Sequence, residues 1–145
     1  ARGMPILTHT SEPVGHLYPG KGSTTPEVVC RFVENFPEVT LICAHWGGGL
    51  PFYTLMPEVS VSLEHVFFDT AASPFLYRPE IFPIVTSLVG ADKILLGTDY
   101  PLIKQKRLIR QVTEAPISDE ARESILYANA ARLLGISVWN DSAPS

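Results

Sequence analysis

The sequence is poor in charge and in long hydrophobic runs, and each shortage excludes a class of protein. Charged residues make up 18% of the 145 residues, and Asp plus Glu outnumber Lys plus Arg by 15 to 11, which gives a net charge of −4. A general nucleic-acid binder needs clustered Lys and Arg to neutralise phosphates, so this balance argues against one. No apolar run approaches the roughly 20 residues that span a bilayer. The first residues also lack the basic and apolar regions of a signal peptide, so a cytoplasmic protein is expected.

Cysteine is equally scarce, with Cys30 and Cys43 alone. Cys43 lies in an apolar run and Cys30 in a predicted helix, which favours two buried free thiols in a reducing compartment; nothing in the sequence supports the alternative, a disulfide. Neither thiol has the polar surroundings of a nucleophile. The glycines 47–49 lack the spacing of a dinucleotide-binding loop and predict a tight turn or a close approach of the backbone.

What is present is an alternation of short apolar runs and longer helical stretches. Runs of strand length begin near residues 5, 39, 66 and 94, and spacings of roughly 30 residues are typical of βα units. Strands that are apolar on both faces belong to a parallel sheet covered by helices. Helices are predicted over residues 26–36, 50–63 with a break at Pro57, 79–88, 104–113, 118–126 and 129–134, the last capped by Gly135. We expect one domain over residues 1–136 and a tail over 137–145.

Ionisable residues follow all four predicted strands. His9, His45, Asp69 and Asp99 come at or just past the strand ends. In a parallel α/β barrel these ends form one face, where active sites are built, so residues far apart in the sequence can converge. Imidazoles and carboxylates are the ligands of zinc and similar divalent ions, and such an ion lowers the pKa of bound water to about 7. The alternatives are a solvated His9, a packed His45, and turn-capping roles for Asp69 and Asp99.

Four segments resemble one known family. Thr-His-Thr-Ser-Glu-Pro-Val-Gly-His (8–16), Ala-His-Trp-Gly-Gly (44–48), Gly-Thr-Asp-Tyr-Pro (97–101) and Asn-Ala-Ala-Arg-Leu-Leu-Gly (129–135) are similar to the later strand-end motifs and the C-terminus of amidohydrolase-related proteins. The resemblance implies an α/β fold, a partial TIM (β/α)8 barrel of about four parallel βα units that corresponds to the second half of the barrel. The family contains metal-dependent hydrolases and also decarboxylases similar to aminocarboxymuconate semialdehyde decarboxylase.

The resemblance also implies roles for individual residues. His9, His45 and Asp99 match metal-binding positions, with zinc the expected ion and manganese the alternative, and His45 and Asp99 match catalytic positions. The family's first-strand His-x-His pair is absent from this sequence, so two ligands are missing. Four strands cannot close a barrel, and we therefore expect open sheet edges and exposed apolar residues. A second copy, a separate N-terminal half or a longer polypeptide would cover them, or the core is remodelled.

Three further residues are candidates for binding a small-molecule substrate. Arg78 has the fork that holds a carboxylate, His16 lies in a Gly- and Pro-rich loop, and Trp46 adjoins the glycine turn. Each has an ordinary alternative, a surface position for Arg78 and His16 and simple packing for Trp46. The first functional hypothesis is a hydrolase that activates water to cleave an amide, ester or lactone-like bond. The alternatives are a metal-dependent decarboxylase and a non-catalytic half-barrel module.

Overall fold

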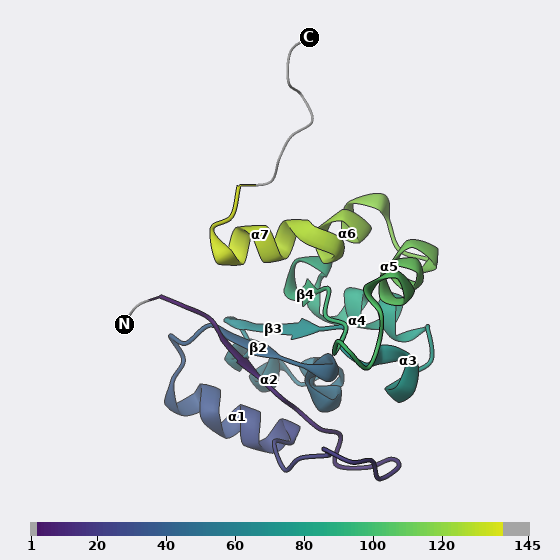
Figure 1. The fold of residues 1–145 in the computed structure, drawn as a ribbon. Helices are drawn as coiled ribbons and strands as arrows, with labels where there is room; N and C mark the ends of the chain where they lie inside the picture. Colours follow the sequence, from purple (N-terminus) through teal and green to yellow (C-terminus); the bar gives the residue numbers. More distant parts are fainter. Residues whose placement is uncertain (1–2, 138–145) are drawn as a thin grey trace.

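The computed structural model describes residues 3–137, so the predicted tail, apart from Ser137, lies outside the described residues. Four short strands form one parallel sheet: β1 (Ile6–Thr8), β2 (Leu41–Cys43), β3 (Val66–Asp69) and β4 (Ile94–Leu95). Their order in the sheet is β1-β2-β3-β4, so each strand pairs with its neighbour in the sequence (Figure 1). This is the arrangement that consecutive βα units produce, and it confirms the predicted parallel sheet.

Helices follow each strand. They are α1 (Pro26–Asn35), α2 (Pro57–Ser62), α3 (Ser73–Leu76), α4 (Ile81–Val89), α5 (Gln105–Glu114), α6 (Asp119–Glu123) and α7 (Asn129–Leu134), with the tighter or wider turns η1 (His45–Leu55), η2 (Ala91–Lys93) and η3 (Ser124–Ala128). The predicted helix 50–63 is divided between η1 and α2 at Pro57. Pro83 fits within α4 because it lies in the first turn, where a backbone N–H has no partner in the helix. Gly135 ends α7 with φ +64°, as predicted.

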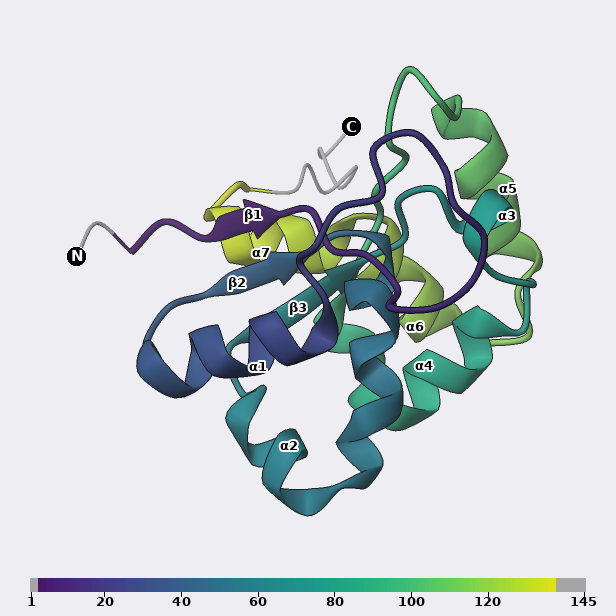
Figure 2. The same ribbon diagram turned by 90° about the horizontal axis from the view of Figure 1, so that it is seen from below.

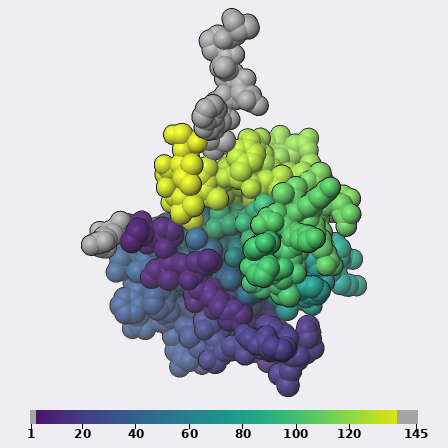
Figure 3. All heavy atoms as spheres, in the orientation of Figure 1, coloured from purple at the N-terminus to yellow at the C-terminus, as the bar shows by residue number. Residues whose placement is uncertain are grey.

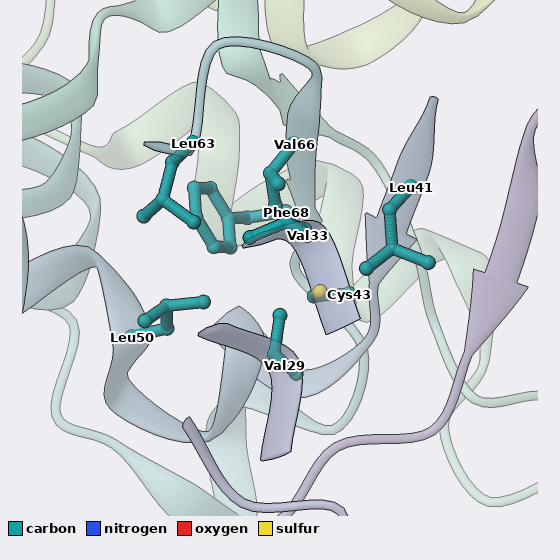
Figure 4. Packing of buried hydrophobic residues seen from close by; sticks show 8 residues of the cluster. All are labelled: Val29, Val33, Leu41, Cys43, Leu50, Leu63, Val66 and Phe68. Carbon is teal, nitrogen blue, oxygen red and sulfur yellow. The ribbon is translucent and has the colours of Figure 1, made fainter. Parts of the chain in front are cut away.

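One of the buried clusters lies between the sheet and α1. Val29 and Val33 of α1 pack against side chains of β2 and β3, and Leu50 and Leu63 close the cluster (Figure 4). Alternate residues of β2, Leu41 and Cys43, face this side and are buried. Figure 2 shows α1 and α2 covering this face of the sheet. Burial raises the pKa of the Cys43 thiol to about 12. Both cysteines are free, as predicted, but Cys43 alone of the two is buried, and Cys30 is half-buried.

The opposite face of the sheet is only partly covered. The strand register places Leu7, Ile42 and Phe67 in one row across β1, β2 and β3. Leu7 is 64% exposed, and Ile42 and Phe67 are half-buried. In Figure 3 the N-terminal segment, drawn in purple, lies on the surface near the yellow C-terminal helix. The expected exposure of apolar residues is confirmed; a second copy or a separate N-terminal half as the partner of this face stays a prediction.

Among residues 3–137, no helix combines the length and the apolar character needed to cross a membrane.

Candidate active site at the carboxyl edge of the sheet

The strand ends open into one cavity. Its volume is about 620 Å³, and four of the residues singled out in the sequence line it: His9, His16, His45 and Asp99. His9 follows β1 directly and His45 stands two residues after β2, so the parallel strands bring the two together across 36 positions of sequence. Apolar side chains form much of the remaining wall, namely Ala72, Phe75, Leu76 and Leu102. The cavity therefore combines a few ionisable side chains with an apolar lining, as small-molecule sites do.

The two histidines are in direct contact. His45 Nε2 lies 3.1 Å from His9 Nδ1, and the rings meet edge to face at a centroid distance of 4.8 Å. His45 Nδ1 lies 3.2 Å from the carbonyl oxygen of Ala71. A carbonyl only accepts hydrogen bonds, so His45 carries its proton on Nδ1 and presents the Nε2 lone pair to His9. Burial lowers the pKa of His9, and the neighbouring His45 lowers it further, while Asp99 and Glu12 oppose these effects.

Asp69 holds the turn that carries His45. Its Oδ1 accepts hydrogen bonds from the backbone N–H groups of His45 and Ala71, each at 2.9 Å. Asp69 is 8% exposed and is not among the residues that line the cavity. Burial raises the pKa of this carboxyl, and the two backbone hydrogen bonds partly oppose the rise. Asp69 therefore orders the site from behind, in agreement with the turn-capping alternative of the sequence analysis.

Replacement of Asp69 with alanine is expected to lower the free energy of unfolding by about 2 kcal/mol, because two buried N–H groups would lose their acceptor. The matched control is Asp92→Ala, since Asp92 is exposed in η2, and we expect it to change stability by less than about 0.5 kcal/mol. Urea denaturation measures both. Equal stability of the two variants would show that the Asp69 hydrogen bonds contribute nothing.

The same carboxyl gives stability a defined pH dependence. Its folded-state pKa lies above the ordinary value of 3.8, so the folded protein retains this proton to higher pH than the unfolded chain does. The contribution of Asp69 to the free energy of unfolding therefore falls as the pH rises from 3.8 through the raised pKa. The variant Asp69→Asn should lack this fall when denaturation is repeated across that pH range.

A left-handed turn follows β2. The five residues His45–Gly49 have consecutive φ values of 57°, 56°, 62°, 62° and 90°. Glycine is required here by sterics, because a Cβ on Gly48 would lie 2.5 Å from the carbonyl oxygen of Ser11 and one on Gly47 would lie 2.8 Å from Phe68. The close approach of the backbone predicted for these glycines is confirmed. Outside glycine, positive φ occurs among the described residues at His45, Trp46, Ala72 and Asp99, and all of these except Trp46 line the cavity. Such strained positions concentrate at functional sites.

Two of the three predicted substrate-binding residues lie away from the cavity. Trp46 is fully buried; its indole N–H donates to Ser73 Oγ at 2.6 Å, and its ring meets Phe82 edge to face. The left-handed turn directs this side chain into the core, so the packing alternative describes its position. Arg78 is exposed in the loop before α4. Neither residue lines the cavity, whereas His16 does.

The apolar wall of the cavity was not predicted from the sequence. Phe75 and Leu76 belong to α3, a helix of four residues, which is too short to give a helical period. Its signal in the sequence is Pro74, a residue favoured in the first turn of a helix. Tyr18 also lines the cavity. It lies in the same Gly- and Pro-rich loop as His16, the one residue of that loop predicted to bind substrate.

The residues present fit part of a metal site. Two imidazole nitrogens bound to one ion lie roughly 3 Å apart, because each metal–nitrogen bond is about 2.1 Å, and the His9–His45 distance has this value. Asp99 contributes a carboxylate to the same cavity. Within residues 3–137 no three His, Cys, Asp or Glu side chains are grouped closely enough to hold an ion. His9 and His45 therefore form a pair of donors, and Asp99 lines the same cavity without completing a group of three with them.

Comparison with known proteins identifies the family. The amidohydrolase family matches residues 1–136, and the chain belongs to this family. A curated relative is the 2-amino-3-carboxymuconate-6-semialdehyde decarboxylase of Caenorhabditis elegans, which is 26% identical over 137 residues, covering 81% of this chain and 34% of the relative. The chain thus spans about a third of the length of that relative.

Solved structures agree on the fold. The dihydroxybenzoic acid decarboxylase from Polaromonas sp. JS666, with bound manganese and the inhibitor 2-nitroresorcinol, superposes with a TM-score of 0.75 at 21% identity, over 92% of this chain and 50% of that chain. A TIM-barrel protein from Bordetella bronchiseptica gives a TM-score of 0.69 at 26% identity, over 92% of this chain and 46% of the other. The four parallel βα units are therefore the architecture of half a (β/α)8 barrel, as predicted.

Proposed function

We propose that this chain forms part of the active site of a metal-dependent decarboxylase that acts on a small unsaturated or aromatic carboxylic acid. The observation that carries the proposal is the His9–His45 nitrogen pair, 3.1 Å apart, in a cavity that Asp99 also lines. The C. elegans relative and the Polaromonas protein are both decarboxylases, which supports this chemistry. Of the two enzymatic hypotheses from the sequence, they favour decarboxylation over hydrolysis.

His9, His45 and Asp99 are the residues that would hold the divalent ion, with further ligands from outside residues 3–137. The manganese in the Polaromonas structure supports a divalent ion of this kind, and zinc, the first expectation from the sequence, is the alternative. Such an ion supplies Lewis-acid charge that binds a substrate carboxylate or hydroxyl group. Nitrogen and carboxylate ligands suit either metal.

The residues of the chain position the substrate and supply a proton. The apolar side chains of Phe75, Leu76 and Leu102 offer a wall for a flat carbon skeleton. In the reaction the bond between the carboxylate carbon and the skeleton breaks, its electron pair stays on the skeleton, carbon dioxide leaves, and a proton takes its place. Asp99, which lines the cavity, is the group of this chain that we assign to deliver that proton, and His45 polarises the substrate. His16 and Tyr18 approach the same space from the loop.

Product analysis tests the proposal. The protein is loaded with Mn²⁺ or Zn²⁺ and given 2-amino-3-carboxymuconate semialdehyde and dihydroxybenzoic acids, with amide, ester and lactone substrates in parallel. We expect stoichiometric release of carbon dioxide from one of the acids and its loss on addition of a chelator. Hydrolysis of an amide, ester or lactone without carbon dioxide release would overturn the proposal in favour of the hydrolase. Absence of both activities would overturn the proposal in favour of the third hypothesis, a non-catalytic half-barrel module.

A further inference from the structure

Ser11 links the loop beside the cavity to His9. Its side chain is fully buried, and its Oγ lies 2.8 Å from His9 Nε2 and 2.9 Å from the backbone nitrogen of Gly22. The backbone of Ser11 is fixed as well, because its N–H donates to the Thr24 carbonyl at 2.9 Å and its carbonyl packs on Gly48. A buried hydroxyl held in this way has little freedom to rotate away from the imidazole.

For a neutral His9, one set of donor directions satisfies the hydrogen bonds of Ser11, His9 and His45. The Gly22 N–H only donates, so Ser11 Oγ accepts there and has its own hydrogen available for His9 Nε2. At the other end, the proton of His45 lies on Nδ1, so His45 Nε2 accepts from His9 Nδ1. A neutral His9 with its proton on Nδ1 satisfies both contacts, because its Nε2 accepts from Ser11 and its Nδ1–H donates to His45. The chain of donors thus runs from Gly22 through Ser11, His9 and His45 to the carbonyl of Ala71.

The loop of residues 12–22 is tied to the same chain. A Cβ on Gly22 would lie 3.2 Å from Cδ2 of His9, so glycine lets the loop pack directly on the imidazole. Lys21, its neighbour, donates from Nζ to the carbonyls of Val14 and His16 at 2.7 and 3.2 Å. These bonds hold together the loop that brings His16 and Tyr18 to the cavity. The position of the loop and the orientation of His9 are therefore coupled through Gly22 and Ser11.

We propose that Ser11 is a positioning residue of this site: its hydroxyl sets the ring orientation of His9, stabilises together with His45 the metal-free form of His9 that carries its proton on Nδ1, and couples both to the loop of residues 12–22. In the metal-bound state, His9 would use Nδ1 as the metal ligand and carry its proton on Nε2. The Ser11 hydroxyl would then accept a hydrogen bond from Nε2 and hold the ring in the same orientation. The consequence for metal binding rests on the proposed function, whereas the proton position in the metal-free protein does not.

Nitrogen-15 NMR of the metal-free protein, labelled in histidine, tests the proposal directly. In the unaltered protein we expect the His9 signal of the form protonated on Nδ1; in Ser11→Ala the form protonated on Nε2 should gain population, and Ser11→Thr should restore the original pattern. The control is Ser62→Ala, which removes a serine hydroxyl that bonds to Val59 in α2, remote from His9. An unchanged His9 pattern in Ser11→Ala would overturn the proposal.

Calorimetric titration with Mn²⁺ gives the second readout. Loss of a group that orients a metal-binding histidine lowers metal affinity by about 10- to 100-fold, so we expect a loss of at least about tenfold for Ser11→Ala and recovery in Ser11→Thr. If the unaltered protein binds Mn²⁺ but forms no carbon dioxide, the proposed function fails while the role of Ser11 stands. Equal affinity of the unaltered protein and Ser11→Ala would overturn the role of Ser11. Should Ser11→Ala not fold, Ser11→Cys replaces it in both experiments.

Discussion

Turnover of the acid substrate is expected to fall by at least about a hundredfold when Asp99 is replaced with asparagine. The change keeps the size of the side chain but removes the negative charge that attracts a divalent ion and the carboxyl that moves a proton, and general acid–base catalysis alone contributes about 10²- to 10⁴-fold. Asp99 lines the cavity and has a φ of 60°, so the backbone is held in a strained conformation where the carboxylate is needed.

Asp92→Asn is the matched control, because Asp92 is an exposed aspartate before β4, at the opposite end of the strand from Asp99. Carbon dioxide release and bound manganese are measured for both variants. The turn after Asp99 is closed by its backbone carbonyl, which accepts from the Leu102 N–H at 2.8 Å, so Asp99→Asn should fold normally. Full turnover in this variant would show that Asp99 has a local structural role alone.

The substitution Gly48→Ala is expected to destabilise the protein by at least about 3 kcal/mol. A Cβ at this position would lie 2.5 Å from the carbonyl oxygen and 2.7 Å from the carbonyl carbon of Ser11. Because these are backbone atoms, the segment that carries His9 and Ser11 would have to move away from the turn that carries His45. Backbone strain at φ +62° adds to this overlap. Thermal unfolding followed by circular dichroism measures the loss.

Gly135→Ala separates the two causes. Gly135 has nearly the same φ, +64°, but a Cβ there meets nothing within 4 Å. We expect this variant to lose about 1 kcal/mol, the cost of the left-handed conformation alone. If Gly48→Ala lost no more than Gly135→Ala, the contact between the glycine turn and Ser11 would have to be loose enough to accept a methyl group.

Much of the fold was accessible from the sequence because its strands are short, apolar and regularly spaced. The predicted start of the second strand near residue 39 was too early, because Val39 still donates to the Phe36 carbonyl in the turn after α1 and β2 begins at Leu41. The helix α3 was missed because four residues give no periodic pattern. Such boundaries depend on hydrogen bonds to distant backbone, which local patterns do not encode.

The site was predictable where topology alone decides it. His9 and His45 meet because they follow adjacent parallel strands, and the rule that places strand ends on one face brings them together. Trp46 was predicted to bind substrate but lies in the core, because the direction of its side chain depends on a positive φ. The neighbouring glycines in the sequence do not show that a tryptophan shares this conformation. Ser11 was not singled out, since its importance lies in contacts with His9 and Gly22 that form when the loop folds back.

The left-handed turn after β2 makes the geometry of this site depend on the chirality of the residues that form the turn. Residues 45–49 trace a backbone path whose mirror image is the ordinary right-handed helical turn. For L-residues the path costs about 1–2 kcal/mol per residue, and for D-residues the same preference has the opposite sign. Glycine, which has no handedness, occupies three of the five positions. His45 and Trp46 are then the two L-residues of this turn that adopt the disfavoured left-handed conformation. The His45 side chain lines the cavity, and the Trp46 side chain is buried in the core.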